Sequence, residues 1–439
     1  MITGRLATAN RPAIAVPILA ALSLLWLLRQ PDFTSFTTLY IDDGIFVNQA
    51  TVGPASIFAP HNGYLHLFPR AIAAVVALVP LAYAPVVIAL ACAVIAFAAM
   101  VVIWWTVRAA QRPWSPAAWI IAGTLAFVPV ASTETISVAA CLQWQLIAAG
   151  IVATGLGRST PRTAAPLAAL LLLTALSSPL TLVLLPSTLW LAWRARREST
   201  AWAPAIAPAA ALLVGLVIQG IVVANTSVSD EAIGTIEVAL FSGTTAVTFL
   251  EMNGPLALLG SPITRPIVSA GAVAVVIAFI LCTLAIAIAA RITAGSIDRE
   301  QRDIRTEFTQ RLALLLAPGV AVIAISLVIR PAVRTLSLGN PGGTRYVLPL
   351  AYAMWVLVIL AIIALLANAR THRSSVVLAG AGILAAAALL ALHWDYSLGR
   401  PDGPRWSAAY TQACAWAEPG EVVTVSMSPP PWITAVPCE

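Results

Sequence analysis

The chain has 439 residues, of which 60% are hydrophobic and only 10% are charged, with a formal net charge of +6. Water-soluble globular proteins are about 45–50% apolar and about 25% charged, so this composition excludes that class. The apolar residues fall in repeated runs of about 20, the length that crosses a hydrocarbon core as a helix. We therefore expect an all-α protein that crosses a membrane several times. All 24 basic residues are arginines, and the absence of lysine beside abundant Ala, Val and Pro is typical of a GC-rich bacterial genome.

Eleven segments are predicted to span the membrane. They cover residues 12–28, 84–106, 116–132, 140–157, 163–177, 179–193, 202–223, 266–290, 312–329, 346–367 and 375–393. The second to sixth of these are short or adjoin one another, so we expect about 11 spans. Arg5 and Arg11 precede the first span and place the N-terminus in the cytoplasm.

The charged residues then sort by side. With the N-terminus inside, 16 of the 24 arginines fall on the cytoplasmic side, whereas 13 of the 18 acidic residues fall outside. Cytoplasmic loops of membrane proteins are enriched in arginine and lysine. The pattern predicts an N-in, C-out topology in a bacterial inner membrane.

The segment 64–82 is apolar but is interrupted near its start by Pro69 and Arg70. If it crossed the membrane, Arg108 and Arg112 would move outside and the alternation of charge would fail from there onward. We therefore expect a re-entrant helix or one that lies at the outer interface.

The first outer loop, residues 30–83, holds a concentration of chemically active residues. Asp42 and Asp43 are adjacent, and His61 and His66 follow in the same loop. Neighbouring carboxylates repel one another, which raises at least one pKa and suits the pair to accept a proton from an alcohol. Two alternatives are a solvated turn or helix N-cap, a favoured place for Asp, and a metal site, although the spacing fits no standard ligand pattern.

This layout resembles the GT-C superfamily of integral-membrane glycosyltransferases, which use polyprenyl-phosphate-linked sugars as donors. The resemblance lies in an acidic pair just after the first span of an N-in protein with about 11 spans. The segments PVASTETISVAACLQWQLIAAG (129–150) and GGTRYVLPLAYAMW (342–355) also resemble bacterial members. The resemblance covers the layout of the whole chain, and its motifs are short.

The resemblance implies that an acidic residue of the first outer loop is the general base. That residue deprotonates the acceptor hydroxyl, which attacks the anomeric carbon with inversion while the lipid phosphate leaves. By position the base is Asp42 or Asp43, with Asp43 preferred. The leaving phosphate needs fixed positive charge, which arginine supplies with a forked geometry. The candidate substrate-binding residues are Arg70, Arg330, Arg334 and Arg345, with His61, His66 and Glu134.

Each of these arginines has a structural alternative, since arginine side chains also reach lipid headgroups by snorkelling. Glu134 has two interpretations as well. At membrane depth an ionisable residue indicates function, whereas in a loop that emerges into water it is only a turn residue.

Residues 1–393 are thus expected to form a GT-C-like transmembrane domain whose active site faces outside. Its expected partners are the bilayer, a polyprenyl-phosphate-linked sugar and a glycan, lipid or protein acceptor, without nucleic acid. No cofactor is expected, and a divalent metal is the alternative. The alternative functions are those of a cell-surface polysaccharide polymerase or ligase and of a membrane transporter.

The tail, residues 394–439, is predicted to form a small extracytoplasmic cap. Cys414 and Cys438 both lie in it, and an oxidising compartment favours a disulfide between them. Residues 421–428 alternate like a short strand, and 428–432 resemble a polyproline turn. Three tryptophans are expected to help hold the cap or, alternatively, to stack on sugar: Trp406, Trp416 and Trp432.

Overall fold

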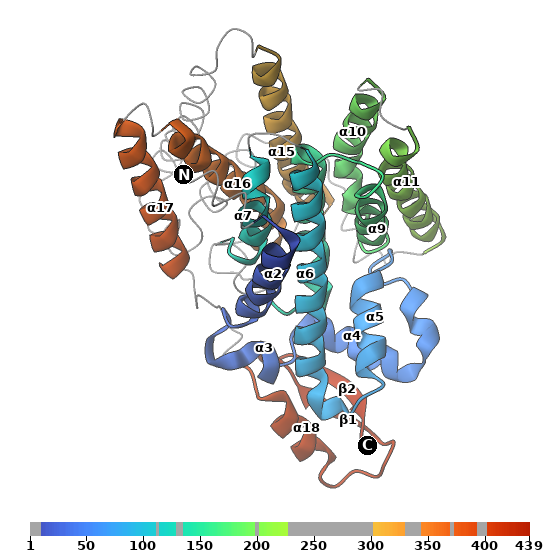
Figure 1. The fold of residues 1–439 in the computed structure, drawn as a ribbon. Helices are drawn as coiled ribbons and strands as arrows, with labels where there is room; N and C mark the ends of the chain where they lie inside the picture. The colour runs from blue at the N-terminus through green and yellow to red at the C-terminus, as the bar shows by residue number, and fades with distance from the viewer. Residues whose placement is uncertain are drawn as a thin grey trace.

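The computed structural model describes residues 10–110, 114–128, 135–197, 202–226, 302–329, 344–368, 373–392 and 402–439. Most of these residues lie in helices, and two strands in the tail pair as a hairpin (Figure 1). The helical class predicted from the composition is confirmed for this part of the chain.

Ten helices in the described part of the chain overlap predicted spans. They are α2 (Pro12–Leu27), α6 (Ala84–Ala109), α7 (Ala118–Gly123), α8 (Leu142–Leu156), α9 (Ala164–Ala175), α10 (Leu185–Arg197), α11 (Trp202–Asn225), α15 (Arg302–Ile329), α16 (Thr344–Asn368) and α17 (Arg373–Leu392). Each overlaps one predicted span, while the predicted span 266–290 lies outside the described residues.

Four helical segments within the described ranges are long and apolar enough to cross a membrane. They are Leu81–Ala109, Ala139–Leu156, Trp202–Asn225 and Arg345–Ile363. A fifth is obtained if α2 and the helical segment Pro31–Thr37, which are bent by 81° to one another, count as one span. Helices such as α9, with 12 residues and a length of about 18 Å, are too short to cross alone.

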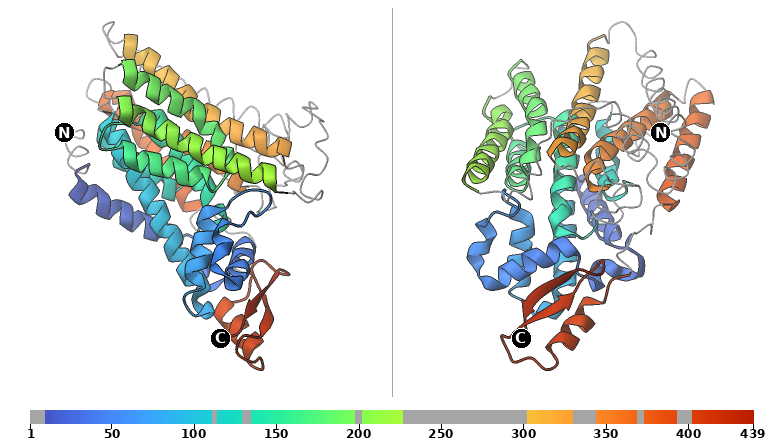
Figure 2. Two further views of the ribbon diagram at one scale, coloured as in Figure 1. Left: turned by 90° about the vertical axis from the view of Figure 1, so that its right-hand side faces the viewer. Right: turned by 180° about the vertical axis from the view of Figure 1, so that it is seen from behind.

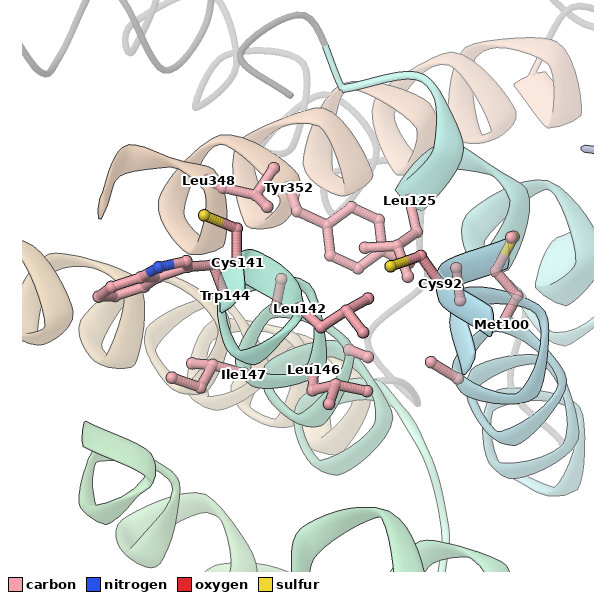
Figure 3. Close-up of a cluster of buried hydrophobic side chains, with 14 of the residues drawn as sticks. Cys92, Met100, Leu125, Cys141, Leu142, Trp144, Leu146, Ile147, Leu348 and Tyr352 are labelled. Atoms are coloured by element: carbon pink, nitrogen blue, oxygen red, sulfur yellow. The ribbon is translucent and has the colours of Figure 1, made fainter. Parts of the chain in front are cut away.

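Helix α8 lies at the centre of the bundle. All 15 of its residues are buried, and it packs against α6, α15 and α16. Figure 3 shows Trp144 and Leu146 of α8 in this apolar cluster with Met100 of α6 and Tyr352 of α16. The hydroxyl of Tyr352 donates to the carbonyl of Ile121, at 2.8 Å. This burial includes two polar side chains of α8, Gln143 and Gln145.

The periphery of the bundle is apolar too. Along α11, a row of large aliphatic side chains is exposed, comprising Leu213, Val214, Val217, Ile218 and Ile221. An exposed apolar surface of this extent is typical of a protein that contacts lipid. The described helices thus have the character of a membrane protein.

Residues 30–83 fold into short helices rather than an extended loop. We call α3 (Thr34–Thr37), α4 (Ile41–Val52) and α5 (Leu67–Val76) the first-loop helices. Helix α5 has ten residues and a length of about 15 Å, too short to span. This agrees with the prediction of a non-spanning helix within 64–82.

The tail forms a compact cap. It consists of α18 (Trp406–Cys414) and the antiparallel strands β1 (Val422–Ser426) and β2 (Ile433–Pro437). The expected disulfide between Cys414 and Cys438 is present. Both views in Figure 2 place the cap beside the first-loop helices, at one end of the bundle.

Only one of the three tail tryptophans holds the cap. Trp406 is buried, and its indole N–H donates to the carbonyl of Leu81 at 2.7 Å. The prediction was wrong for Trp416 and Trp432, whose side chains are 98% and 53% exposed. Trp416 lies in the turn after α18, and Trp432 lies in the loop that joins the strands.

Tyr410 of α18 joins the end of the tail to the cap. Its hydroxyl donates to the carbonyl of Pro437 and accepts from the N–H of Glu439. Burial, and then the charge of Glu439, raise the pKa of Tyr410. The carboxylate of Glu439 in turn accepts a hydrogen bond from the N–H of Leu81, at 2.8 Å.

The cap docks on the start of α4. The N–H of Ile41 donates to the carbonyl of Ser428, and the N–H of Ser428 donates to the carbonyl of Leu39, each at 2.9 Å. The hydroxyl of Thr434 donates to the carbonyl of Gly44 at 3.0 Å. The cap therefore fixes the helix that carries the acidic pair.

We expect Gly44→Ala to loosen this docking. Alanine favours a helix by about 1 kcal/mol over glycine, but its Cβ would meet the buried thioether of Met427, and overpacking costs about 1–3 kcal/mol. The cap should become more sensitive to protease. Gly44→Ala should cost less in a Met427→Ala background than in the wild type, since the two substitutions act on one contact. Strictly additive effects would contradict this account.

Candidate active site

The acidic pair lies in the first turn of α4. The N-cap residue is Tyr40, so Asp42 and Asp43 follow the cap rather than forming it. Carboxylates are favourable in the first turn because the helix dipole is positive there. The alternative in which an Asp is the N-cap residue is therefore wrong, because the cap lies two residues before Asp42. The expected position at a helix N-terminus is confirmed.

Asp42 pairs with Arg345 from the other half of the chain. The guanidinium Nη1 lies 3.0 Å from Oδ2 of Asp42, and the two side chains are 20% and 32% exposed respectively. The same nitrogen lies 3.8 Å from the sulfur of Cys141. Arg345 thus supplies a counter-charge to a helical turn that carries two adjacent carboxylates.

Asp43 has a different environment. It is 2% exposed, and its Oδ1 accepts a hydrogen bond of 3.0 Å from the backbone N–H of Ala140, just before α8. The acidic pair is therefore connected to the starts of two central helices, α8 through Asp43 and α16 through Asp42.

A second group of side chains gathers around Phe46, which follows Asp42 by one turn of α4. The ring centroid of Phe46 lies 5.1 Å from that of His61 and 5.4 Å from that of His66. The two histidine rings are 5.4 Å apart. Tyr64 packs on His66 with a centroid separation of 4.0 Å. The two histidines predicted as site residues therefore lie together, against Phe46 of the helix that carries the acids.

Arg70 organises the loop around this group. Its guanidinium lies 5.4 Å from the centroid of Phe46 and donates to the carbonyls of Ser56, at 2.7 Å, and Pro60, at 3.3 Å. Burial lowers the pKa of the Arg70 guanidinium. Its contacts are thus with its own loop, and it does not join the Asp42–Arg345 pair.

Sequence reasoning missed Gln219 of α11. Its side-chain amide bonds both the N–H and the carbonyl of Leu65, each at 3.0 Å, and so ties the histidine segment to the bundle. A buried glutamine inside an apolar span was the available signal, because polar side chains at such depth usually bond to another segment. The role of Ala140 could not be predicted from its side chain, because its backbone N–H makes the contact with Asp43.

Three predicted site residues, Glu134, Arg330 and Arg334, lie outside the described residues. Within the described part of the chain, no three His, Cys, Asp or Glu side chains lie close enough together to hold a metal ion.

No family model, curated protein or solved structure matches this chain. The function is therefore inferred from the geometry of the Asp42–Arg345 pair and from the sequence pattern.

Proposed function

We propose that this chain is a bacterial inner-membrane glycosyltransferase of the GT-C type, with about 11 spans, an N-in, C-out topology and an active site that faces outside. It transfers a sugar with inversion from a polyprenyl-phosphate donor to an extracytoplasmic acceptor. The observation that carries the proposal is the partly exposed pair of Asp42 and Arg345. It combines a carboxylate that can accept a proton with a guanidinium that can bind a phosphate.

Asp42 is the base in this proposal, because its carboxylate is partly exposed whereas that of Asp43 is buried. It takes the proton of the acceptor hydroxyl as the hydroxyl oxygen bonds to the anomeric carbon. The bond from that carbon to the phosphate oxygen breaks, and Arg345 stabilises the phosphate that leaves. Asp43 acts as a positioning residue, which fixes the first turn of α4 through Ala140.

The position of Arg345 supports a functional role. It lies in the first turn of α16, where the positive end of the helix dipole disfavours a cation. Residues that break a local rule are expected at functional sites. A donor phosphate would compete with Asp42 for the guanidinium, so donor binding would release the carboxylate for the proton.

The distribution of arginine supports the orientation. Arg108 lies in the last turn of α6, at the end away from the cap. Arg194, Arg196 and Arg197 lie in the last turn of α10. Such a cluster is expected on the cytoplasmic side.

The test uses purified protein in liposomes with polyprenyl-phosphate-linked sugars. The wild type should release polyprenyl phosphate, and the double variant Asp42→Asn/Asp43→Asn should not. Asp32→Asn, the same change in the same loop, is the control and should remain active. Release that persists in the double variant would overturn the proposal, and sugar uptake without release would indicate a transporter.

A further inference from the structure

The start of α8 carries a buried amide close to the acidic turn. Gln143 is the second residue of this helix, and its side chain is only 7% exposed. Within the described part of the chain, its Oε1 atom is buried and has no hydrogen-bond partner. Such an atom destabilises a fold unless another molecule supplies the missing donor. The position of Gln143 therefore requires an explanation beyond the packing of α8.

Gln145 of the same helix shows what a structural glutamine does here. It is also buried, and its Nε2 donates to the carbonyl of Thr135 at 2.7 Å. This hydrogen bond ties α8 to the segment that precedes it. The contacts of the described residues give Gln145 a structural role that they do not give to Gln143.

Gln143 lies about one helical turn after the point where the site residues meet the start of α8. Asp43 accepts a hydrogen bond from the N–H of Ala140, and Nη1 of Arg345 lies 3.8 Å from the sulfur of Cys141. Side chains of a helix lean toward its N-terminus and cover the preceding turn. The amide of Gln143 therefore leans toward the turn that Asp43 and Arg345 contact.

A second polar side chain just before α8 shows the same feature. Ser137 is buried, and its Oγ has no hydrogen-bond partner among the described residues. Its backbone has a φ of 55°, in the left-handed region that is costly for a residue other than glycine. Two polar side chains without partners thus lie in one short segment at the start of α8.

We propose that Gln143 binds a hydroxyl group of the donor sugar. The inference rests on the proposed function, in which Arg345 holds the donor phosphate, and the sugar attached to that phosphate then lies beside the start of α8. An amide offers an acceptor and two donors, whereas a hydroxyl group both donates and accepts. A site built to bond a hydroxyl discriminates strongly against an analogue that lacks it. Gln143 thus selects among donor sugars, and the reacting atoms are left to Asp42 and Arg345.

The melting temperatures of two variants separate this role from a structural one. Gln143→Met keeps the size of the side chain but removes its unpartnered oxygen, so the melting temperature of the purified full chain should rise by about 2 °C. Gln145→Met is the matched control in the same helix. It loses the hydrogen bond to Thr135 and should melt at a lower temperature than the wild type. A lower melting temperature in Gln143→Met would mean that the amide supports the fold, and it would overturn the proposal.

Donor binding is measured from the rise in melting temperature that a polyprenyl-phosphate-linked sugar causes, which needs no turnover. The apparent Kd of Gln143→Met should be about tenfold higher than that of the wild type. Donors that each lack one hydroxyl then identify the bonded group. One of them should bind the wild type about tenfold more weakly than the parent donor, but should bind Gln143→Met as well as the parent donor does, because both changes remove one contact.

The outcomes distinguish this inference from the proposed function. If donors bind through Gln143 but no sugar is transferred, the proposed function fails and the inference stands. If sugar is transferred and Gln143→Met binds every donor as the wild type does, the inference is overturned and the proposed function stands. It is also overturned if each missing hydroxyl weakens binding equally in the wild type and in Gln143→Met. If no donor binds to the wild type or reacts with it, both are overturned.

Discussion

Asp42→Asn is expected to slow sugar transfer by about 10²- to 10⁴-fold, the usual contribution of a general base. Asparagine keeps the size of the side chain and an oxygen for Arg345, so the fold should be retained. Asp43→Asn should cost much less, because its amide oxygen can still accept the hydrogen bond from Ala140. The measurement is the turnover number of each variant with saturating donor.

The comparison between the two variants decides which acid is the base. A larger loss in Asp43→Asn than in Asp42→Asn would return the role to Asp43, the residue that the sequence pattern favoured. Asp32→Asn controls for the loss of one negative charge in the same loop. Melting temperatures of all three variants should stay close to that of the wild type.

Loss of the Cys414–Cys438 disulfide is expected to destabilise the cap by about 3 kcal/mol. The bond closes a loop across a sequence separation of 24 residues, and the chain-entropy estimate for such a loop is of that size. The population of the undocked cap should rise by about 10²-fold. Limited proteolysis of Cys414→Ser/Cys438→Ser should therefore cleave the tail faster than in the wild type.

The faster cleavage of the tail should depend only on the loss of the Cys414–Cys438 disulfide. Reducing agent should make the wild type resemble the double variant and should leave the double variant unchanged. If the reduced wild type keeps its cap as well protected as before, the contacts of Trp406 and Glu439 with Leu81 suffice to hold it, and the disulfide is dispensable.

Much of the bundle could be predicted because apolar runs bounded by charge or proline are strong signals. The span 84–106 matches α6, which begins beside Pro85 and has Arg108 in its last turn. Of the first-loop helices, α5 was predicted as a non-spanning helix, whereas α3 and α4 could not be predicted, since they are short and depend on tertiary packing. Strand β2 was missed for a similar reason, because five residues after a proline-rich turn give little pattern.

The residues of the candidate site could be predicted from the sequence, but the contacts between them could not. Asp42 and Arg345 are separated by 303 positions, and no local spacing reports such a pair. The contact of Asp43 with Ala140 uses a backbone N–H, which every non-proline residue has. For the tail tryptophans, composition could not say that Trp406 would be buried and Trp416 exposed.

The docking of the cap on α4 sets an order for biogenesis. The hydrogen bond from Thr434 to Gly44 joins residues 390 positions apart, and the cap follows the membrane helices along the chain. The ribosome therefore makes the acidic turn early and the cap that docks beside it much later. In the proposed topology, a nascent chain that has inserted its helices but has not yet exported the cap would carry the acids on a helix without its docking partner, so maturation of the site would coincide with export of the cap.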